Sequence, residues 1–391
     1  MRRILLEALG INRVGGARTS ILNTIKALPQ VVPNVEFVVC LSQPEPILAS
    51  IPQIKQVVVP APNRFVARLK LWALLPRITR HLNIDLVHFT KNLMVNFLHC
   101  PRIVTVLDLT ALRFPETQSF LDVIYWRWIE PLHLHKANGI IAISQDTAND
   151  LITFYNISPQ RIWIVRLAVD DRFLHPVRAE EIQYVRYKYN LPEDYILFVG
   201  ILAKKKNLGT LLRTIYTMHR IGKNVHLTIV GRFYPQSDAS GDLNLIKALG
   251  LSDLVHYLGE VPDEDLPALY AGAKAYIMPS LHEGFGIPCL EAMAVGTPVI
   301  ASRRGALPEV VGEAGILVDD PLNVTEWVEA IQKCLEDEHL RATLIERGYH
   351  RVKGRTWQTV AAETFAVYQA VCPSLQGIQI KPPLSVAGGI V

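Results

Sequence analysis

Short runs of apolar residues alternate along the chain with longer amphipathic stretches, and this alternation constrains the fold more than any other feature. Runs of this kind, bounded by turn residues, are typical of strands buried in a parallel sheet. The pattern predicts an α/β fold with two Rossmann-like doubly wound domains that face each other across a cleft. The predicted strands are Ile4–Leu6, Glu36–Leu41, Gln56–Val59, Leu86–His88, Ile103–Leu107, Gly139–Ile143 and Ile162–Val165, then Ile196–Val199, His226–Val230, Val255–Leu258, Ala275–Met278, Pro298–Ala301 and Gly315–Val318.

Two domains are also expected from length, because 391 residues exceed what one ordinary hydrophobic core holds. The segment Leu167–Pro176 has neither a helical nor a strand period and ends in proline, so it is the predicted linker. This places an N-terminal domain at 1–168 and a C-terminal domain at 177–355. A last helix is predicted over Trp357–Val371, within 356–372, and a disordered tail over 373–391, where no periodicity remains.

Composition narrows the class of protein. The net charge is only +4, too small to require a nucleic acid partner, and none is expected. Five scattered cysteines without metal-ligand spacing are typical of reduced thiols in the cytoplasm. The N-terminal apolar run is too short for a signal peptide, and no stretch of about 18 apolar residues is present for a membrane span. We therefore expect a cytoplasmic protein, with the inner face of the membrane as a second location.

The stretch Ser280–Ser302 carries the clearest chemistry. Glu283 and Glu291 flank a glycine turn that leads into a helix, with Pro288 as its first residue and Gly296 just past its end. Such a turn directs backbone N–H groups and a positive helix dipole at one spot, which suits a diphosphate. One carboxylate is expected before the helix and the other in its first turn. Ionised carboxylates only accept hydrogen bonds, so they suit sugar hydroxyls.

These residues, EGFG-P-LEAMA-GTPV with two glutamates eight positions apart, resemble the motif of family 4 retaining glycosyltransferases of the GT-B fold. The resemblance continues over about residues 1–370. Its other matching segments are Tyr195–Gly200 followed by Lys206 and Asn207, His256–Val261 followed by Leu266 and Leu269–Tyr270, and Leu307–Gly312.

The resemblance implies transfer of a sugar from a nucleotide-diphosphate-sugar donor to an acceptor hydroxyl, with the anomeric configuration kept. The expected acceptor is a saccharide or a lipid-linked molecule in polysaccharide or glycolipid assembly. The N-terminal domain would bind the acceptor and the C-terminal domain the donor, and the last helix would cross back to the N-terminal domain. The family needs no other cofactor, and no Asp-x-Asp metal platform stands in a suitable place, so no metal is expected.

The resemblance also assigns site residues. The expected catalytic residues are Glu283, Lys206 and Asp108. The expected donor-binding residues are Gly15, Gly16, Lys205, Arg232, Val261, Gly284, Phe285, Gly286, Leu290 and Glu291. Each has a plainer interpretation: a carboxylate near a helix start stabilises the helix, a lysine triplet is usually a solvated turn, and a glycine pair is often only flexible. The Gly15–Gly16 pair lacks the spacing of a dinucleotide fingerprint, which argues against an NAD enzyme.

One departure from the family lies at the C-terminal end of a first-domain strand, where many relatives have His-Asp and this chain has Leu107-Asp108. Leu107 cannot act as an imidazole, so a second hypothesis is a catalytically weak protein that binds nucleotide-sugar in a regulatory or complex-forming role. His88 could supply a polar group instead, although a lone histidine is more often structural. A nucleotide-sugar epimerase on the same fold is a third hypothesis, which the two glutamates fit poorly.

A basic amphipathic segment, Arg64–Arg80, offers one further partner. Its charges alternate with large apolar residues, and helices of this kind lie on anionic membranes. The plainer interpretation is that its apolar face packs on the sheet while the charges face water, with Pro76 breaking the helix. Peripheral contact with a membrane is therefore a secondary expectation.

Overall fold

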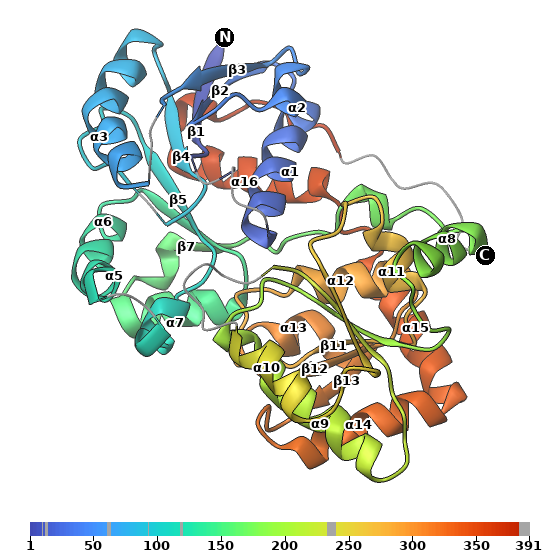
Figure 1. The fold of residues 1–391 in the computed structure, drawn as a ribbon. Coiled ribbons are helices and arrows are strands. Elements are labelled where there is room, and N and C mark those ends of the chain that lie inside the picture. Colours follow the sequence, from blue (N-terminus) through green and yellow to red (C-terminus); the bar gives the residue numbers. More distant parts are fainter. Residues whose placement is uncertain are drawn as a thin grey trace. The chain divides into compact units, whose positions relative to one another are not determined.

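The computed structural model describes residues 1–9, 11, 15–60, 64–92, 94–117, 120–232 and 240–382, and it divides into two compact units (Figure 1). The first unit comprises Met1–Leu167 together with the C-terminal segment from Gly354. The second comprises Ala168–Lys353. The boundary falls inside the predicted linker, whose residues from Ala168 onward belong to the second unit. There they form a short 3-10 turn, Asp171–Phe173, with a buried Phe173.

In its described residues the first unit has one seven-stranded parallel sheet in the order β3-β2-β1-β4-β5-β6-β7. The strands are β1 (Arg2–Glu7), β2 (Val35–Leu41), β3 (Ile54–Val58), β4 (Leu86–Phe89), β5 (Arg102–Val106), β6 (Gly139–Ala142) and β7 (Ile162–Ile164). The helices are α1 (Gly16–Val31), α2 (Pro46–Ala49), α3 (Arg64–His81), α4 (Thr110–Arg113), α5 (Phe120–Ile124), α6 (Glu130–Leu134) and α7 (Gln145–Tyr155), with a π-helical turn at Tyr125–Ile129 between α5 and α6.

The last helix, α16 (Trp357–Val371), has the predicted bounds and packs against α1 and β6 of the first unit. A buried histidine joins it to the sheet: His88 Nδ1 lies 2.6 Å from the Tyr368 hydroxyl and Nε2 lies 2.7 Å from Thr105 Oγ1. Burial lowers the pKa of His88 to about 3, so the ring is neutral. The plainer interpretation of His88 as a structural residue is therefore correct.

Beyond α16 the chain forms a 3-10 turn at Pro373–Leu375, and the Lys381 amide donates to the Val31 carbonyl at 2.8 Å. The part of the predicted disordered tail at 383–391 lies outside the described residues.

The prediction that Pro76 breaks the third helix is wrong, because α3 runs from Arg64 to His81 with Pro76 inside it. A proline removes one helical hydrogen bond, but tertiary packing can outweigh that loss. Here Leu71 and Leu75 before the proline are fully buried in the core of the first unit, and Thr79 after it is also fully buried, so packing holds the helix on both sides of the proline.

In the described part of the second unit, six parallel strands form one sheet in the order β10-β9-β8-β11-β12-β13. The strands are β8 (Ile196–Val199), β9 (Leu227–Val230), β10 (Val255–Gly259), β11 (Ala275–Met278), β12 (Val299–Ser302) and β13 (Gly315–Val318). The helices are α8 (Ala179–Lys188), α9 (Leu208–Arg220), α10 (Ser240–Ala248), α11 (Leu266–Ala271), α12 (Ile287–Ala294), α13 (Leu307–Val311), α14 (Val324–Glu336) and α15 (Glu338–Val352).

All of the predicted strands are confirmed, with ends within two residues of those expected. Each sheet reverses its winding once, between β1 and β4 in the first unit and between β8 and β11 in the second. In open α/β sheets, ligands bind beyond the carboxyl ends of the strands at this reversal. Among the described helices, none is both long and apolar enough to cross a lipid bilayer.

Candidate active site

The candidate residues of the second unit follow the carboxyl ends of four neighbouring strands. The loop after β8 carries Lys205 and Lys206, and the loop after β11 carries Glu283. Arg232 follows β9, and Val261 follows β10. The sequence separates these loops widely, but the strand order β10-β9-β8-β11 places them along one edge of the sheet. The winding reversal between β8 and β11 is therefore where the lysine and glutamate loops meet.

At that reversal Lys206 Nζ donates to Glu283 Oε1 at 2.6 Å. Both side chains are largely shielded, with 13% and 10% of their surface exposed. Burial by itself would raise the pKa of Glu283, but Lys206 and the nearby Lys205 outweigh it and hold that pKa below its usual value. Glu283 is thus an ionised carboxylate, next to an ammonium group, at the end of a parallel sheet.

Backbone and amide contacts hold the two loops in this arrangement. Asn207 adopts a left-handed conformation, φ 56°, at the start of α9, which asparagine tolerates better than most residues. Its Nδ2 donates to the carbonyls of Pro279 at 3.1 Å and Pro321 at 2.7 Å, beyond the ends of β11 and β13. The Leu281 amide also donates to the Lys205 carbonyl at 2.7 Å. These contacts link three loops of the same edge and position Lys206 opposite Glu283.

The glycine turn after Glu283 leads into α12. Gly284, Phe285 and Gly286 are all buried, and Gly286 has φ 105°, a conformation that favours glycine. A Cβ at Gly286 would lie 2.7 Å from Leu307 Cδ2, so space as well as conformation requires glycine there. The first backbone N–H groups of a helix have no partner within the helix, so this turn directs donors at the sheet edge.

The expected place of Glu291 in the first turn of α12 is wrong. The helix begins at Ile287, one residue before Pro288, and Glu291 is beyond the first turn. Pro288 still belongs to the first turn, where a missing N–H costs little. Gly296 follows the helix with φ 79°, as predicted for a residue just past a C-terminus. Leu290 precedes Glu291 on α12 and is buried.

Glu291 has a hydrogen-bond partner that sequence analysis did not assign. The Tyr270 hydroxyl on α11 donates to Glu291 Oε2 at 2.9 Å. Burial raises the pKa of Glu291 to about 7, while the Tyr270 hydrogen bond and the charge of Arg172 act in the opposite direction. The signal for this contact was present, because a tyrosine in an apolar helix needs a polar partner for its hydroxyl when it is buried.

Lys205 and Arg232 supply further positive charge around the same edge. Arg232 Nε lies 3.4 Å from Glu260 Oε1, and both side chains are more than two-fifths exposed, so this ion pair contributes little stability. A backbone hydrogen bond fixes the main chain at Arg232, because the Arg232 carbonyl accepts from the Leu202 amide at 2.8 Å. Val261, two residues beyond β10, is half-buried.

The remaining candidates, Gly15, Gly16 and Asp108, lie in the first unit. Gly15 caps α1 with φ 115°, and Gly16 is the first residue of that helix. Asp108 follows β5, and its Oδ1 accepts from the Thr110 amide at 3.1 Å, the local capping contact that was its plainer interpretation. Leu107, predicted as the last residue of its strand, lies directly after β5, and its amide donates to Asn92 Oδ1 at 3.2 Å. The donor-binding roles of Gly15 and Gly16 and the catalytic role of Asp108 stay predictions.

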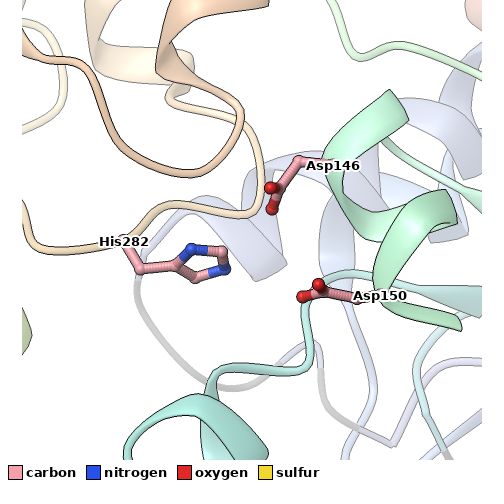
Figure 2. Close-up of side chains that lie close together, drawn as sticks. All are labelled: Asp146, Asp150 and His282. Atoms are coloured by element: carbon pink, nitrogen blue, oxygen red, sulfur yellow. The ribbon is translucent and has the colours of Figure 1, made fainter. Parts of the chain in front are cut away.

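An ion-pair cluster anchors the segment that follows β5. Arg113, at the end of α4, donates from Nε to Asp150 Oδ2 at 2.9 Å and lies 3.7 Å from Asp146 Oδ1. Asp146 and Asp150 are one turn apart on α7 (Figure 2). The hydrogen bonds to Asp150 raise the pKa of Arg113. In the second unit, His282, also drawn in Figure 2, precedes Glu283 on the loop after β11 and is buried.

The raised pKa of Glu291 predicts a pH dependence of stability. An ordinary glutamate titrates near 4.5, whereas Glu291 in the folded chain titrates near 7. Between these values the folded state keeps a proton that the unfolded state has lost, so this group's contribution to stability falls as pH rises through that window. The wild type should lose on the order of 1–3 kcal/mol of its free energy of unfolding across this window because of Glu291. Glutamine does not titrate, so the Glu291→Gln variant should not show this loss.

Urea unfolding of both proteins at pH 4.5 and pH 8 measures this effect. The variant should be similar to the wild type at the lower pH and more stable at the higher one. Equal dependence of the two proteins on pH would show that Glu291 ionises normally. Glu309→Gln, in another helix of the same unit, is a control for the loss of one glutamate.

Two family models match the chain, and they cover different halves. The model described as "Glycosyl transferases group 1" matches residues 182–351, and the model "Glycosyltransferase Family 4" matches residues 14–173. The first match contains the whole sheet of the second unit. The second match begins two residues before α1 and ends just past the unit boundary.

Relatives and solved structures agree with these matches. O-antigen chain mannosyltransferase B of Escherichia coli is 32% identical over 270 residues, which cover 68% of this chain and 70% of the relative. MMP alpha-(1->4)-mannosyltransferase of Mycolicibacterium hassiacum is 34% identical over 233 residues, 59% of this chain and 53% of the relative. The chain therefore spans about half of this second relative.

Among solved structures, sucrose-phosphate synthase from Thermosynechococcus elongatus aligns with a TM-score of 0.79 at 22% identity, over 96% of this chain and 100% of that one. The Anabaena protein HepE, solved in complex with UDP and glucose, aligns with a TM-score of 0.77 at 19% identity, over 95% and 100% of the two chains. At these identities the structural likeness establishes the fold.

Proposed function

The chain belongs to glycosyltransferase family 4 and is a glycosyltransferase of the GT-B fold, and from this premise we propose that it is a retaining enzyme that uses a nucleotide-diphosphate-sugar donor. It transfers the sugar to an acceptor hydroxyl in polysaccharide or glycolipid assembly. The observation that carries this proposal is the Lys206–Glu283 pair at the winding reversal of the second sheet, beside the glycine turn that begins α12.

In this proposal Lys206 and the backbone amides at the start of α12 bind the diphosphate. An ammonium group and a helix N-terminus both favour the negative charge that develops on a departing diphosphate. Lysine has three N–H donors, so Lys206 can keep Glu283 while it binds phosphate oxygens. These groups take the place that a divalent cation has in other transferases, and the enzyme needs neither a metal nor another cofactor.

The two glutamates have separate roles in the proposal. Glu283, kept ionised by Lys206, accepts hydrogen bonds from hydroxyls of the donor sugar. Glu291, supported by the Tyr270 hydroxyl, accepts from the ribose hydroxyls of the nucleotide. Two solved structures of one protein of the same fold, HepE, support a nucleotide-sugar donor, because one contains UDP and glucose and the other UDP-glucose. The relatives named as mannosyltransferases favour a mannose donor and a saccharide or lipid-linked acceptor.

Release of nucleoside diphosphate from a panel of nucleotide-sugars, with and without acceptor, tests the proposal. We expect turnover within the ordinary enzyme range, about 1 s⁻¹ or faster, with one preferred donor. Activity should survive EDTA, because Lys206 rather than a metal ion stabilises the leaving group. NMR of the product should show the same anomeric configuration as the donor, and an inverted configuration would contradict a retaining mechanism. Loss of activity in EDTA with rescue by Mg²⁺ or Mn²⁺ would contradict the metal-independent mechanism.

The same assay separates the catalyst from the second hypothesis, a protein that binds nucleotide-sugar without efficient transfer. Leu107 is the observation that favours this alternative, since its apolar side chain follows β5 where many family members have histidine. A chain that binds a donor in a calorimetric titration but releases no diphosphate with any acceptor would establish the alternative and exclude our proposal.

A further inference from the structure

An apolar and basic surface on the first unit has no role in the proposed transfer reaction. Its apolar part consists of Leu69 and Trp72 on α3, Phe97 after β4, and Trp128 and Leu132 of the α5–α6 helical stretch. All five side chains are exposed, from 44% for Trp72 to 71% for Phe97. Large apolar side chains that gather on a surface mark a site of interaction. We call this set the aromatic surface.

Ring contacts join the three segments of the aromatic surface. The Trp72 ring lies 6.2 Å from the Phe97 ring in an edge-on arrangement and 6.0 Å from the His133 ring on α6. Within the α5–α6 stretch, Phe120, Ile124, Trp128 and Leu132 recur at every fourth residue, and each is exposed. This spacing places neighbouring side chains on the same side of a helix. The apolar residues therefore form one connected surface.

The third helix contributes to both the core and this surface. Leu71 and Leu75 are buried against the sheet, as the plainer interpretation of Arg64–Arg80 predicted. That packing does not use Leu69 or Trp72, which are 55% and 44% exposed. Packing on the sheet thus explains why Leu71 and Leu75 are apolar. It does not explain why the exposed positions of Leu69 and Trp72 are apolar.

The charge around the aromatic surface is mostly positive. Arg77 and Arg80 are exposed on α3, and the Arg127 guanidinium lies 6.0 Å from the centre of the Trp128 ring. From residue 64 to residue 107 the sequence has one acidic residue, Asp85, which is bonded to Arg2. In the α5–α6 stretch, Glu130 is buried and Asp122 is half-buried. Among the described side chains, the helices that carry the apolar residues therefore also carry three exposed arginines, against one partly exposed acidic residue, Asp122.

We propose that the aromatic surface docks on an anionic lipid bilayer. Tryptophan prefers the interface between lipid and water, and arginine next to it binds acidic headgroups. Separate protruding side chains can each enter lipid, whereas a protein partner must provide a complementary pocket for every one of them. The inference does not depend on the transfer reaction, so vesicle binding and activity can fail separately.

Flotation with vesicles of phosphatidylcholine, with and without phosphatidylglycerol, tests the inference on the full chain. We expect binding only when phosphatidylglycerol is present, and weakening as salt screens the charges. The triple variant Arg77→Gln, Arg80→Gln, Arg127→Gln should bind roughly a hundredfold more weakly, at about fivefold for each basic residue. The matched control Arg220→Gln, Lys247→Gln, Lys333→Gln removes equal charge from exposed positions of the second unit and should bind like the wild type.

A second pair of variants tests the apolar part. Trp128→Ser with Leu132→Ser should lower binding roughly tenfold or more, because two side chains no longer enter lipid. Tyr187→Ser with Leu322→Ser is the control, since those side chains are 89% and 63% exposed in the second unit. In a third arm, Trp128→Phe should keep binding but reduce the quenching of tryptophan fluorescence by brominated lipid.

Three outcomes would overturn the inference. The wild type would fail to bind phosphatidylglycerol vesicles, or it would bind neutral vesicles equally well, or the control variants would lose as much binding as the matched test variants. A second copy of the chain is the alternative occupant. Light scattering that shows a dimer dissociated by Trp128→Ser and Leu132→Ser, without vesicle binding, would assign the aromatic surface to that dimer.

Discussion

Lys206→Ala is expected to lower kcat by about 10²–10³, the usual effect of removing one preorganised group that stabilises a leaving group. The ammonium group of Lys206 bonds to Glu283 at the carboxyl end of the second sheet. In the proposed reaction, the variant therefore lacks a cation that stabilises the departing diphosphate. The measurement is diphosphate release under saturating donor and acceptor, compared with the wild type.

Loss of Lys206 also leaves Glu283 buried without its partner, so part of the effect could come from stability. The double variant Lys206→Ala, Glu283→Gln removes that unpaired charge and should recover stability without recovering the rate. Lys204→Ala is the matched control, because Lys204 belongs to the same lysine triplet but is exposed. The expected decrease is far greater than about threefold. If kcat of Lys206→Ala is within about threefold of kcat of Lys204→Ala, Lys206 is not a catalytic residue.

Gly305→Ala is expected to destabilise the second unit by about 2–4 kcal/mol, through overpacking and an unfavourable backbone conformation. Gly305 has φ 59°, and a Cβ there would lie 2.5 Å from the Glu283 carbonyl oxygen and 2.8 Å from His282 Nδ1. The next residue, Ala306, donates its amide to the same Glu283 carbonyl at 2.9 Å. The loop after β12 is therefore packed directly on the backbone that presents Glu283.

The midpoint of urea unfolding measures this effect, and diphosphate release at a temperature where the variant is folded measures the displacement of Glu283. Gly222→Ala is the matched control: Gly222 has φ 79°, but a Cβ there meets no atom within 4 Å. It should lose only about 1 kcal/mol, the cost of the left-handed conformation. Equal losses in the two variants would show that the contact with Glu283 is unimportant.

Local pattern was sufficient to predict the strands. A short apolar run between turn residues most often forms a buried strand, and β8, β11 and β13 have the predicted bounds. The glycine turn and Pro288 likewise predicted the start of α12 to within one residue. Pro76 shows where local rules fail, because buried side chains before it (Leu71 and Leu75) and after it (Thr79) keep α3 packed on the sheet.

The sequence by itself determined the strands, the α/β class, the family motif and the identity of most candidate residues, since each of these depends on neighbours along the chain. Only the tertiary structure decided which residues meet. Lys206 and Glu283 are 77 positions apart, and Tyr270 and Glu291 are 21 apart. Strand order determines which loops share a sheet edge, and burial determines which charged groups are shielded from water. Neither is a property of local sequence, because both arise only when distant strands and helices pack together.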